Sequence, residues 1–207
     1  MTKREKRAPS AERNRFAILE VLKEVLPPSG TVLEISSGTG QHAAYFAPEL
    51  TPHRWQPSEF ERALIGSIEA WGARVPSANL FPPIMLDASA PMWPVEEAPP
   101  NPPISAIVNI NMIHIAPWAA CLGLLAGAGR ILPPGGILYL YGPYRRGGAH
   151  TVSSNEDFDR SLQARDPQWG VRDLDEVEAA AKGEGLVLDQ VIEMPVNNLS
   201  VVFRKPA

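Results

Sequence analysis

The sequence has one cysteine, Cys121, and four histidines along its 207 residues. One cysteine cannot form an internal disulfide, so we do not expect a secreted fold held together by disulfide bonds. His42, His53, His114 and His150 are widely separated, and with a single cysteine they do not have the spacing of a metal site. We therefore expect no bound metal.

Long apolar runs are also missing. No apolar segment follows the basic N-terminal residues, which argues against a signal peptide. The uncharged stretch from Ile115 to Gly129 is interrupted by Pro117, and it is shorter than the ~20 residues of a membrane-spanning helix. We therefore expect a cytoplasmic protein without a membrane partner.

Charged residues are sparse, at 20% of the chain, and acidic ones prevail, with 23 Asp and Glu against 19 Lys and Arg. Residues 1–15 hold six basic and two acidic side chains, or +4, so the remaining residues carry 13 − 21 = −8. An acidic body is not expected to bind nucleic acid. The charge pattern predicts a basic flexible tail over residues 1–8 and a single domain over residues 9–207.

Proline and glycine, in contrast, are frequent, with 22 and 16 residues. They interrupt helices and strands, and no Gly-X-Y period appears, so a coiled coil and a collagen-like repeat are excluded. Because 44% of the residues are hydrophobic, the chain has enough apolar surface for a folded core. We expect short, sharply ended elements.

The apolar pattern predicts strands that alternate with helices along most of the chain. This order predicts an α/β fold, a doubly wound, mostly parallel seven-stranded sheet with an antiparallel last strand. Ser58 and Glu61 are spaced as a capping box for the third helix, and Asp173 and Glu176 begin the last one. Residues 90–103 and 142–154 are expected to be loops. The predicted strands are 31–35, 53–56, 84–87, 104–110, 137–141, 186–193 and 199–203.

A glycine-rich turn follows the first predicted strand. In such a sheet, ligands bind where the first strand passes into its helix, and glycines there let the backbone approach the ligand. Gly38, Gly40 and Ala43 also satisfy the dinucleotide pattern G-x-G-x-x-A, and Glu59 follows at a distance suited to a ribose diol. The glycines alone therefore leave a nicotinamide cofactor and another adenosine cofactor open.

Glu34 separates these two possibilities. A carboxylate four residues before Gly38 would repel a pyrophosphate, whereas it suits a ligand with an ammonium or sulfonium group. An acid that only caps nearby amides is the structural alternative for Glu34.

The segment Glu34-x-Ser36-x-Gly38-x-Gly40 resembles the first motif of class I S-adenosylmethionine-dependent methyltransferases. That superfamily usually has a glycine where Ser36 stands. The resemblance implies a seven-stranded sheet of the topology above and S-adenosylmethionine as the cofactor. It also implies that Glu59 binds the ribose hydroxyls and that Asp87 lies near the adenine.

Several further segments recur together in one family. On them the chain is similar to the methyltransferase-like 26 family (domain-of-unknown-function family 938), over nearly its whole length. Glu59 stands where that family more often has Asp, a change that keeps the carboxylate. The resemblance implies the cofactor and leaves the substrate open. The segments are residues 33–42, 56–59, 111–118, 141–144, 154–159 and 169–173.

The loop after the fourth strand offers the first acceptor-side groups. His114 is the predicted general base, because imidazole titrates near neutral pH. A histidine that packs and makes one hydrogen bond is an equally good interpretation. Asn111 and Met112 are predicted to line the methionine end of the cofactor.

The loop after the fifth strand offers further groups. Tyr144 is predicted to act beside His114, by a hydrogen bond to the acceptor or by stacking on it. Arg145 is predicted to hold an acidic group of the substrate, with a solvated lid as the alternative. Tyr141, Asn155 and the N-terminal Asn14 complete the predicted substrate site.

We therefore expect an S-adenosylmethionine-dependent methyltransferase with a small-molecule methyl acceptor. Two alternatives remain open. One is a regulatory protein that binds S-adenosylmethionine without turnover, and the other is an NAD(P)-dependent oxidoreductase, against which Glu34 argues.

Overall fold

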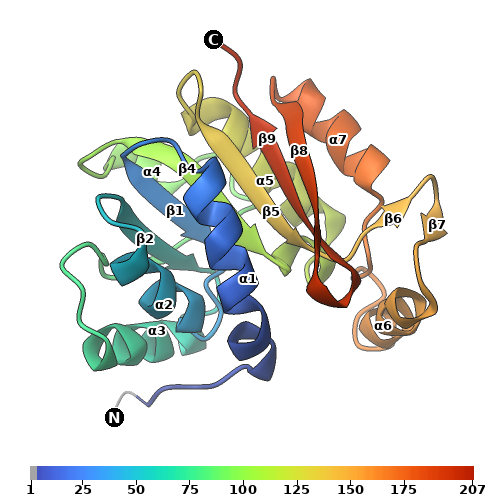
Figure 1. Ribbon diagram of the computed structural model, residues 1–207, viewed down its shortest axis with the longest axis horizontal. Helices are drawn as coiled ribbons and strands as arrows, with labels where there is room; N and C mark the ends of the chain where they lie inside the picture. Colours follow the sequence, from blue (N-terminus) through green and yellow to red (C-terminus); the bar gives the residue numbers. More distant parts are fainter. Residues whose placement is uncertain (1–3) are drawn as a thin grey trace.

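A seven-stranded sheet forms the centre of the protein in the computed structural model, which describes residues 4–207 (Figure 1). The strand order is β3-β2-β1-β4-β5-β9-β8, and β9 alone runs antiparallel to its two neighbours. The predicted fold class is therefore confirmed. The strands are β1 (Thr31–Ile35), β2 (Arg54–Glu59), β3 (Ile84–Met85), β4 (Ile104–Ile110), β5 (Ile137–Gly142), β8 (Val187–Met194) and β9 (Asn198–Arg204).

Helices cover both faces of the sheet (Figure 1). One face carries α1 (Pro9–Val25) and α2 (Gln41–Glu49), with α3 (Arg62–Arg74) beside α2. The other face carries α4 (Pro94–Glu97), α5 (Trp118–Ile131) and α7 (Leu174–Gly183). A small hairpin of β6 (Arg145–Arg146) and β7 (Ala149–His150) lies with α6 (Ser153–Gln163) at one end.

The strands are apolar on both sides because each side is covered. Successive side chains of a strand point to opposite faces. In β1, Val32 packs with Phe46 on the α1 and α2 face, whereas Leu33 packs with Leu124 on the α5 face. This double burial explains why β4 is an almost continuous apolar run, as expected for a parallel sheet.

The predicted capping box at Ser58 is wrong. Strand β2 continues to Glu59, so Ser58 lies inside it, and its hydroxyl donates a hydrogen bond to the Glu34 carbonyl at 2.7 Å. Helix α3 begins at Arg62, and no side chain caps it. At α7 the Asp173 part of the prediction is confirmed, because its carboxylate accepts a hydrogen bond from the Asp175 amide; Glu176 lies in the first turn of the helix.

Both predicted loops contain short regular elements. Residues 90–103 include α4, where the Glu96 carboxylate accepts a hydrogen bond from the Trp93 amide at 2.7 Å. Residues 142–154 include the β6–β7 hairpin, in which Gly147 and Gly148 take positive φ angles. These elements are too short to produce an apolar period in the sequence.

The segment before α1 lies against α2 and α3. The Lys6 amide donates to the Ser67 hydroxyl at 2.8 Å, and the Lys6 carbonyl accepts from the Trp71 indole at 2.8 Å. The Ala8 amide donates to the Gln41 side chain. Lys6 and Ala8 are thus held on the domain, unlike the flexible tail expected over residues 1–8; residues 1–3 lie outside the described part.

Within residues 4–207, no helix has the length and apolarity needed to cross a membrane.

Candidate functional site

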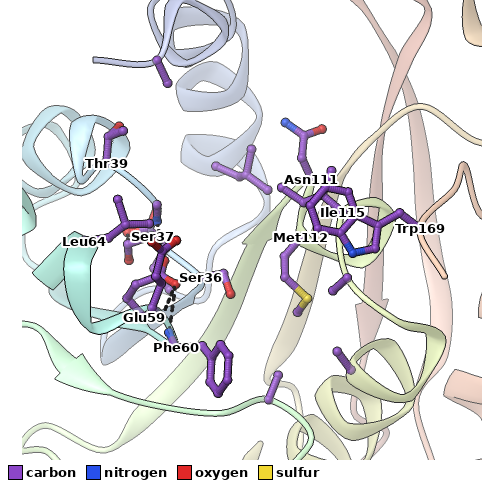
Figure 2. A pocket seen from close by; sticks show the side chains of 18 of the residues that line it. Ser36, Ser37, Thr39, Glu59, Phe60, Leu64, Asn111, Met112, Ile115 and Trp169 are labelled. Carbon is purple, nitrogen blue, oxygen red and sulfur yellow. Dashed lines mark hydrogen bonds between the residues drawn. The ribbon is translucent and has the colours of Figure 1, made fainter. Parts of the chain in front are cut away.

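A cavity of about 700 Å³ opens where β1, β2 and β4 end (Figure 2). Parallel strands present their carboxyl ends at one edge of the sheet, where ligands of such folds bind. The volume is within the range of small-molecule sites. The walls come from the start of α1, the turn after β1, the ends of β2 and β3, the segment after β4 and the α6–α7 connection.

The turn after β1 requires left-handed backbone at three positions. Ser36, Gly38 and Gly40 have φ angles of 58°, 57° and 89°. Gly38 lines the cavity, and a Cβ built on it meets nothing within 4 Å. Gly40 does not line the cavity; a Cβ there would lie 2.6 Å from the Ile68 Cα. Gly40 thus allows α3 to pack closely, and the structure does not place it among the cofactor contacts predicted for it.

Glu34 is buried on the cavity wall, with 1% of its surface exposed. One carboxylate oxygen accepts hydrogen bonds from the Ser37 hydroxyl at 2.8 Å and the Trp55 indole at 3.0 Å. Burial raises the pKa of Glu34 to about 7, although these two hydrogen bonds oppose the rise. A positively charged ligand beside Glu34 would favour its ionised form.

Glu59, at the end of β2, holds the glycine turn that follows β1 (Figure 2). One of its oxygens accepts the Gly38 amide at 2.8 Å, and the other accepts the amides of Phe60 at 2.9 Å and Glu61 at 3.0 Å. A carboxylate has about four acceptor positions, so it can still bind a hydroxyl group of a ligand.

The remaining predicted cofactor residues also line the cavity. Asp87 lies two residues after β3, and one of its oxygens accepts hydrogen bonds from the Ser89 amide at 2.9 Å and the Ser89 hydroxyl at 2.6 Å. Asn111 and Met112 lie across the cavity from Glu59, and Asn111 has a φ of 66° (Figure 2). The structure therefore brings Glu34, Ser36, Gly38, Glu59, Asp87, Asn111 and Met112 together on one cavity.

His114 lies behind the cavity wall and is fully buried. Its Nδ1 accepts a hydrogen bond from the Arg172 amide at 3.2 Å, and its carbonyl accepts the Gly170 amide at 2.9 Å. Burial, together with the charge of Arg172, lowers the pKa of His114 to about 3. His114 therefore joins the β4–α5 segment to the α6–α7 connection, and the structure does not bring it to the cavity as a base.

Tyr144 and Arg145 also lie outside the cavity lining. Tyr144 is buried and meets the His114 ring edge-on, with centroids 5.1 Å apart. Burial raises its pKa well above the usual range of a phenol. Arg145 lies in β6, and its backbone amide donates to the Arg172 carbonyl at 3.0 Å. Their predicted contacts with the substrate are not supported by this placement.

The other predicted substrate residues are paired within the fold. Asn14 places its side-chain oxygen 2.8 Å from His42 Nε2. The buried Tyr141 is hydrogen-bonded to the side chains of Asn14 and Asn198, and burial raises its pKa. Asn155 donates to the Asn197 carbonyl at 3.1 Å. Asn14, Tyr141 and Asn155 do not line the cavity, because these partners hold them in the fold.

His42 is a cavity residue to which the sequence assigned no role. Its Nε2 donates to the Asn14 oxygen, since an amide oxygen can only accept, and its ring stacks on Phe46 at 5.2 Å. Burial lowers the pKa of His42 to about 4, and the charge of Arg15 adds to this, so the ring is neutral at pH 7. Its place directly after the glycine turn was the available signal.

Four larger side chains on the wall were also missed. Phe60 and Leu64 follow Glu59 along the chain, so the end of β2 was a signal for them. Arg165 and Trp169 belong to the α6–α7 connection, far along the chain from the glycine turn; Trp169 begins the recurring segment 169–173, which was the available signal, and no motif marks Arg165. Within residues 4–207, no group of three His, Cys, Asp or Glu side chains could hold a metal ion.

Comparison with solved structures relates the fold to methyltransferases. CalO1, a methyltransferase in calicheamicin biosynthesis in its SAH-bound form, matches with a TM-score of 0.71 and 16% identity, over 96% of this chain and 54% of that one. The mitomycin 7-O-methyltransferase MmcR matches with a TM-score of 0.76 and 13% identity, over 95% of this chain and 54% of that one. An O-methyltransferase family protein from Burkholderia thailandensis matches with a TM-score of 0.77 and 10% identity, over 93% of this chain and 56% of that one.

This chain therefore spans a little over half the length of these three proteins, and the shared part is a Rossmann-like methyltransferase fold. At the level of sequence, one family model, described as "Protein of unknown function (DUF938)", matches residues 5–205. The match covers nearly the whole chain, and the protein belongs to the DUF938 family.

Proposed function

We propose that the protein is an S-adenosylmethionine-dependent methyltransferase that acts on a small molecule. The observation that carries this proposal is a single cavity at the ends of β1 and β2 that holds Glu34, Gly38 and Glu59. We also propose that the DUF938 family is the methyltransferase-like 26 family that the sequence motifs resemble.

The groups on the cavity wall suit this cofactor. When bound, S-adenosylmethionine supplies a methyl group activated by a positively charged sulfonium. Glu34 offers a buried carboxylate to a cation, and Glu59 offers acceptor oxygens to ribose hydroxyls. Phe60 gives apolar surface for a base, and Met112 lies on the cavity wall, where it could line the methionine end. Gly38 leaves the turn open toward the ligand, because no side chain projects from it.

The chain's own groups would act mainly by positioning and by excluding water. Hydrogen bonds through Glu59 hold the glycine turn, so the site is formed before a ligand binds. His42 is neutral at pH 7 and hydrogen-bonded to Asn14, so it adds no positive charge beside a cationic cofactor. The negative charge of the wall, with Glu34, Glu59 and Asp87, agrees with that preference.

Isothermal titration tests the cofactor. We expect S-adenosylmethionine and S-adenosylhomocysteine to bind, and NADH and NADPH to leave no heat above dilution. Glu59→Gln should weaken both adenosine ligands about tenfold or more, because an amide accepts fewer hydrogen bonds than a carboxylate. Binding of NADH or NADPH without S-adenosylmethionine would replace this proposal with an oxidoreductase.

A protein that binds the cofactor without turnover is the second candidate. One observation favours it, namely that His114 and Tyr144 lie outside the cavity lining. Labelled S-adenosylmethionine with metabolite extracts separates the two candidates. Transfer of label to a small molecule supports the enzyme, whereas binding without any transfer supports the regulatory protein.

A further inference from the structure

One wall of the cavity differs in chemistry from the wall that holds the carboxylates. Glu34, Glu59 and the glycine turn form the polar wall. Met112, Ile115 and Trp169 lie across from Glu59 (Figure 2). Asn111 lies on this side too, but the neighbouring lining residues of the segment after β4 are apolar and none is a carboxylate; they are Ile110, Ala116, Pro117, Ala119 and Ala120.

Trp169 is held firmly in place. Its amide donates to the Asp166 carbonyl at 3.0 Å, and the next residue, Gly170, donates to the His114 carbonyl at 2.9 Å. The Arg172 guanidinium donates to the carbonyls of Ile113, Ala116 and Gln168 at 2.8, 2.7 and 2.9 Å. These bonds tie the α6–α7 connection to the segment after β4, so the backbone that carries the indole is held in place before any ligand binds.

Arg165 supplies a positive charge beside this indole. Its guanidinium lies over the Trp169 ring, 4.9 Å from the centroid, and among residues 4–207 it is the one Lys or Arg that lines the cavity. Among residues 4–207, no carboxylate lies within ion-pair distance of Arg165. An unpaired guanidinium beside a flat apolar ring can bind an acidic group on a molecule that stacks there.

From this arrangement we infer that the methyl acceptor is a flat aromatic molecule carrying an acidic group. Its ring system lies against Trp169 and Ile115, and its acidic group pairs with Arg165. The inference rests on the proposed function and names the class of its substrate. The same arrangement disfavours polyamines and other cations, since Arg165 would repel them.

Binding of simple aromatic acids tests the inference without turnover. The full chain, saturated with S-adenosylhomocysteine, is titrated with 4-hydroxybenzoate, 6-hydroxy-2-naphthoate and anthracene-2-carboxylate. The corresponding primary amides and hexanoate serve as matched ligands. We expect at least one aromatic acid to bind, with its amide and hexanoate each about tenfold weaker or undetectable.

Variants assign the binding to the two residues. Arg165→Gln should weaken the acid about tenfold and leave the amide unchanged, whereas Trp169→Leu should weaken both ligands. Arg160→Gln is the matched control, because Arg160 is exposed on α6 and pairs with Glu156 away from the cavity lining. If Trp169→Leu does not fold, Arg165→Gln still decides, since its side chain is exposed.

Several outcomes would overturn the inference. They are binding of none of the three acids, equal binding of acid and amide, or an unchanged acid affinity in Arg165→Gln. A loss of S-adenosylhomocysteine affinity in Arg165→Gln would also overturn it, because Arg165 would then serve the cofactor. Absence of S-adenosylhomocysteine binding by the wild type is a separate result, which defeats the proposed function itself.

Discussion

At the scale of single residues, the buried carboxylate near the end of β1 lowers stability where it is ionised. Glu34 has almost no exposed surface, and burial raises its pKa to about 7 from an ordinary value of 4.5. Because the folded form holds the proton more tightly, the free energy of unfolding falls as pH rises from 4.5 to 7. Above pH 7 the free protein therefore carries a buried carboxylate that a cationic ligand would stabilise.

Glu34→Gln tests this conflict between stability and binding. The variant should be more stable than the wild type at pH 8, by about 1–3 kcal/mol, and equally stable at pH 4.5, because glutamine does not ionise. It should also lose at least about tenfold in S-adenosylmethionine affinity. Chemical denaturation at both pH values, with titration at pH 8, measures the two effects. A variant less stable than the wild type at pH 8 would contradict the raised pKa.

The two glycines of the turn should respond differently to alanine. Gly40→Ala places a Cβ against the backbone of α3 at a positive φ, so we expect it to lower the free energy of unfolding by about 2–4 kcal/mol. In Gly38→Ala the added methyl group meets no neighbouring atom, so the free energy of unfolding should fall by only about 1 kcal/mol. The methyl group lies on the cavity wall, however, and should weaken S-adenosylmethionine binding. Denaturant unfolding and titration of both variants check this; equal losses of stability would refute it.

At the scale of elements, Asp173 at the N-terminus of α7 joins this helix to the β6–β7 hairpin. The Asp173 carboxylate accepts the amides of Asp175, within α7, and Gly148, in the β6–β7 hairpin. Removing it leaves both amides without this partner, so Asp173→Ala should lower the free energy of unfolding by about 1–2 kcal/mol. Asp157→Ala is the control, since its exposed ion pair contributes little. Similar losses in both variants would show that the cap has no special weight.

The sequence predicted long elements well and short-range detail less well. Strands β1, β4 and β5 appear at the predicted places because each is mostly apolar and bounded by proline, glycine or polar residues, whereas the polar β2 continues three residues beyond its predicted end. Ser58 was assigned to a helix cap because its spacing to Glu61 fits both a cap and a strand end. The register that pairs Ser58 with Ile84 in β3 decided the matter, and a register between distant strands leaves no local pattern.

Some of the cavity residues could likewise be predicted from the sequence, and others could not. The residues of the polar wall could be predicted to lie together because they stand at or near strand ends, whose place in a parallel sheet is known once the strand order is known. His114, by contrast, follows β4 yet is covered by Gly170 and Arg172, which are more than fifty residues away. Trp169 reaches the opposite wall through those same bonds. Contacts of this range depend on the packed fold and could not be predicted from the motif alone.

On the scale of the whole molecule, the rate at which the Cys121 thiol reacts measures how often the core opens. Its side chain is fully buried on α5, and burial raises the pKa of the thiol to about 12. We expect a thiol reagent such as DTNB to react at pH 8 only as fast as the domain opens, and bound S-adenosylmethionine to slow the reaction further. The denatured protein is the control, in which the thiol should react at once. Fast labelling of the native protein would show that the helix layer over the sheet opens easily.

The position of β9 has a consequence for how the chain acquires its fold. This strand follows all the others in sequence, yet it lies inside the sheet, between β5 and β8. Before it is inserted, β5 presents an unpaired edge and β8 has no neighbour in the sheet, and such edges favour association between chains. Late arrival of an interior strand also requires contacts between distant parts of the chain, which slow folding. Chaperone demand during synthesis should therefore be concentrated on chains in which residues 198–204 are not yet available.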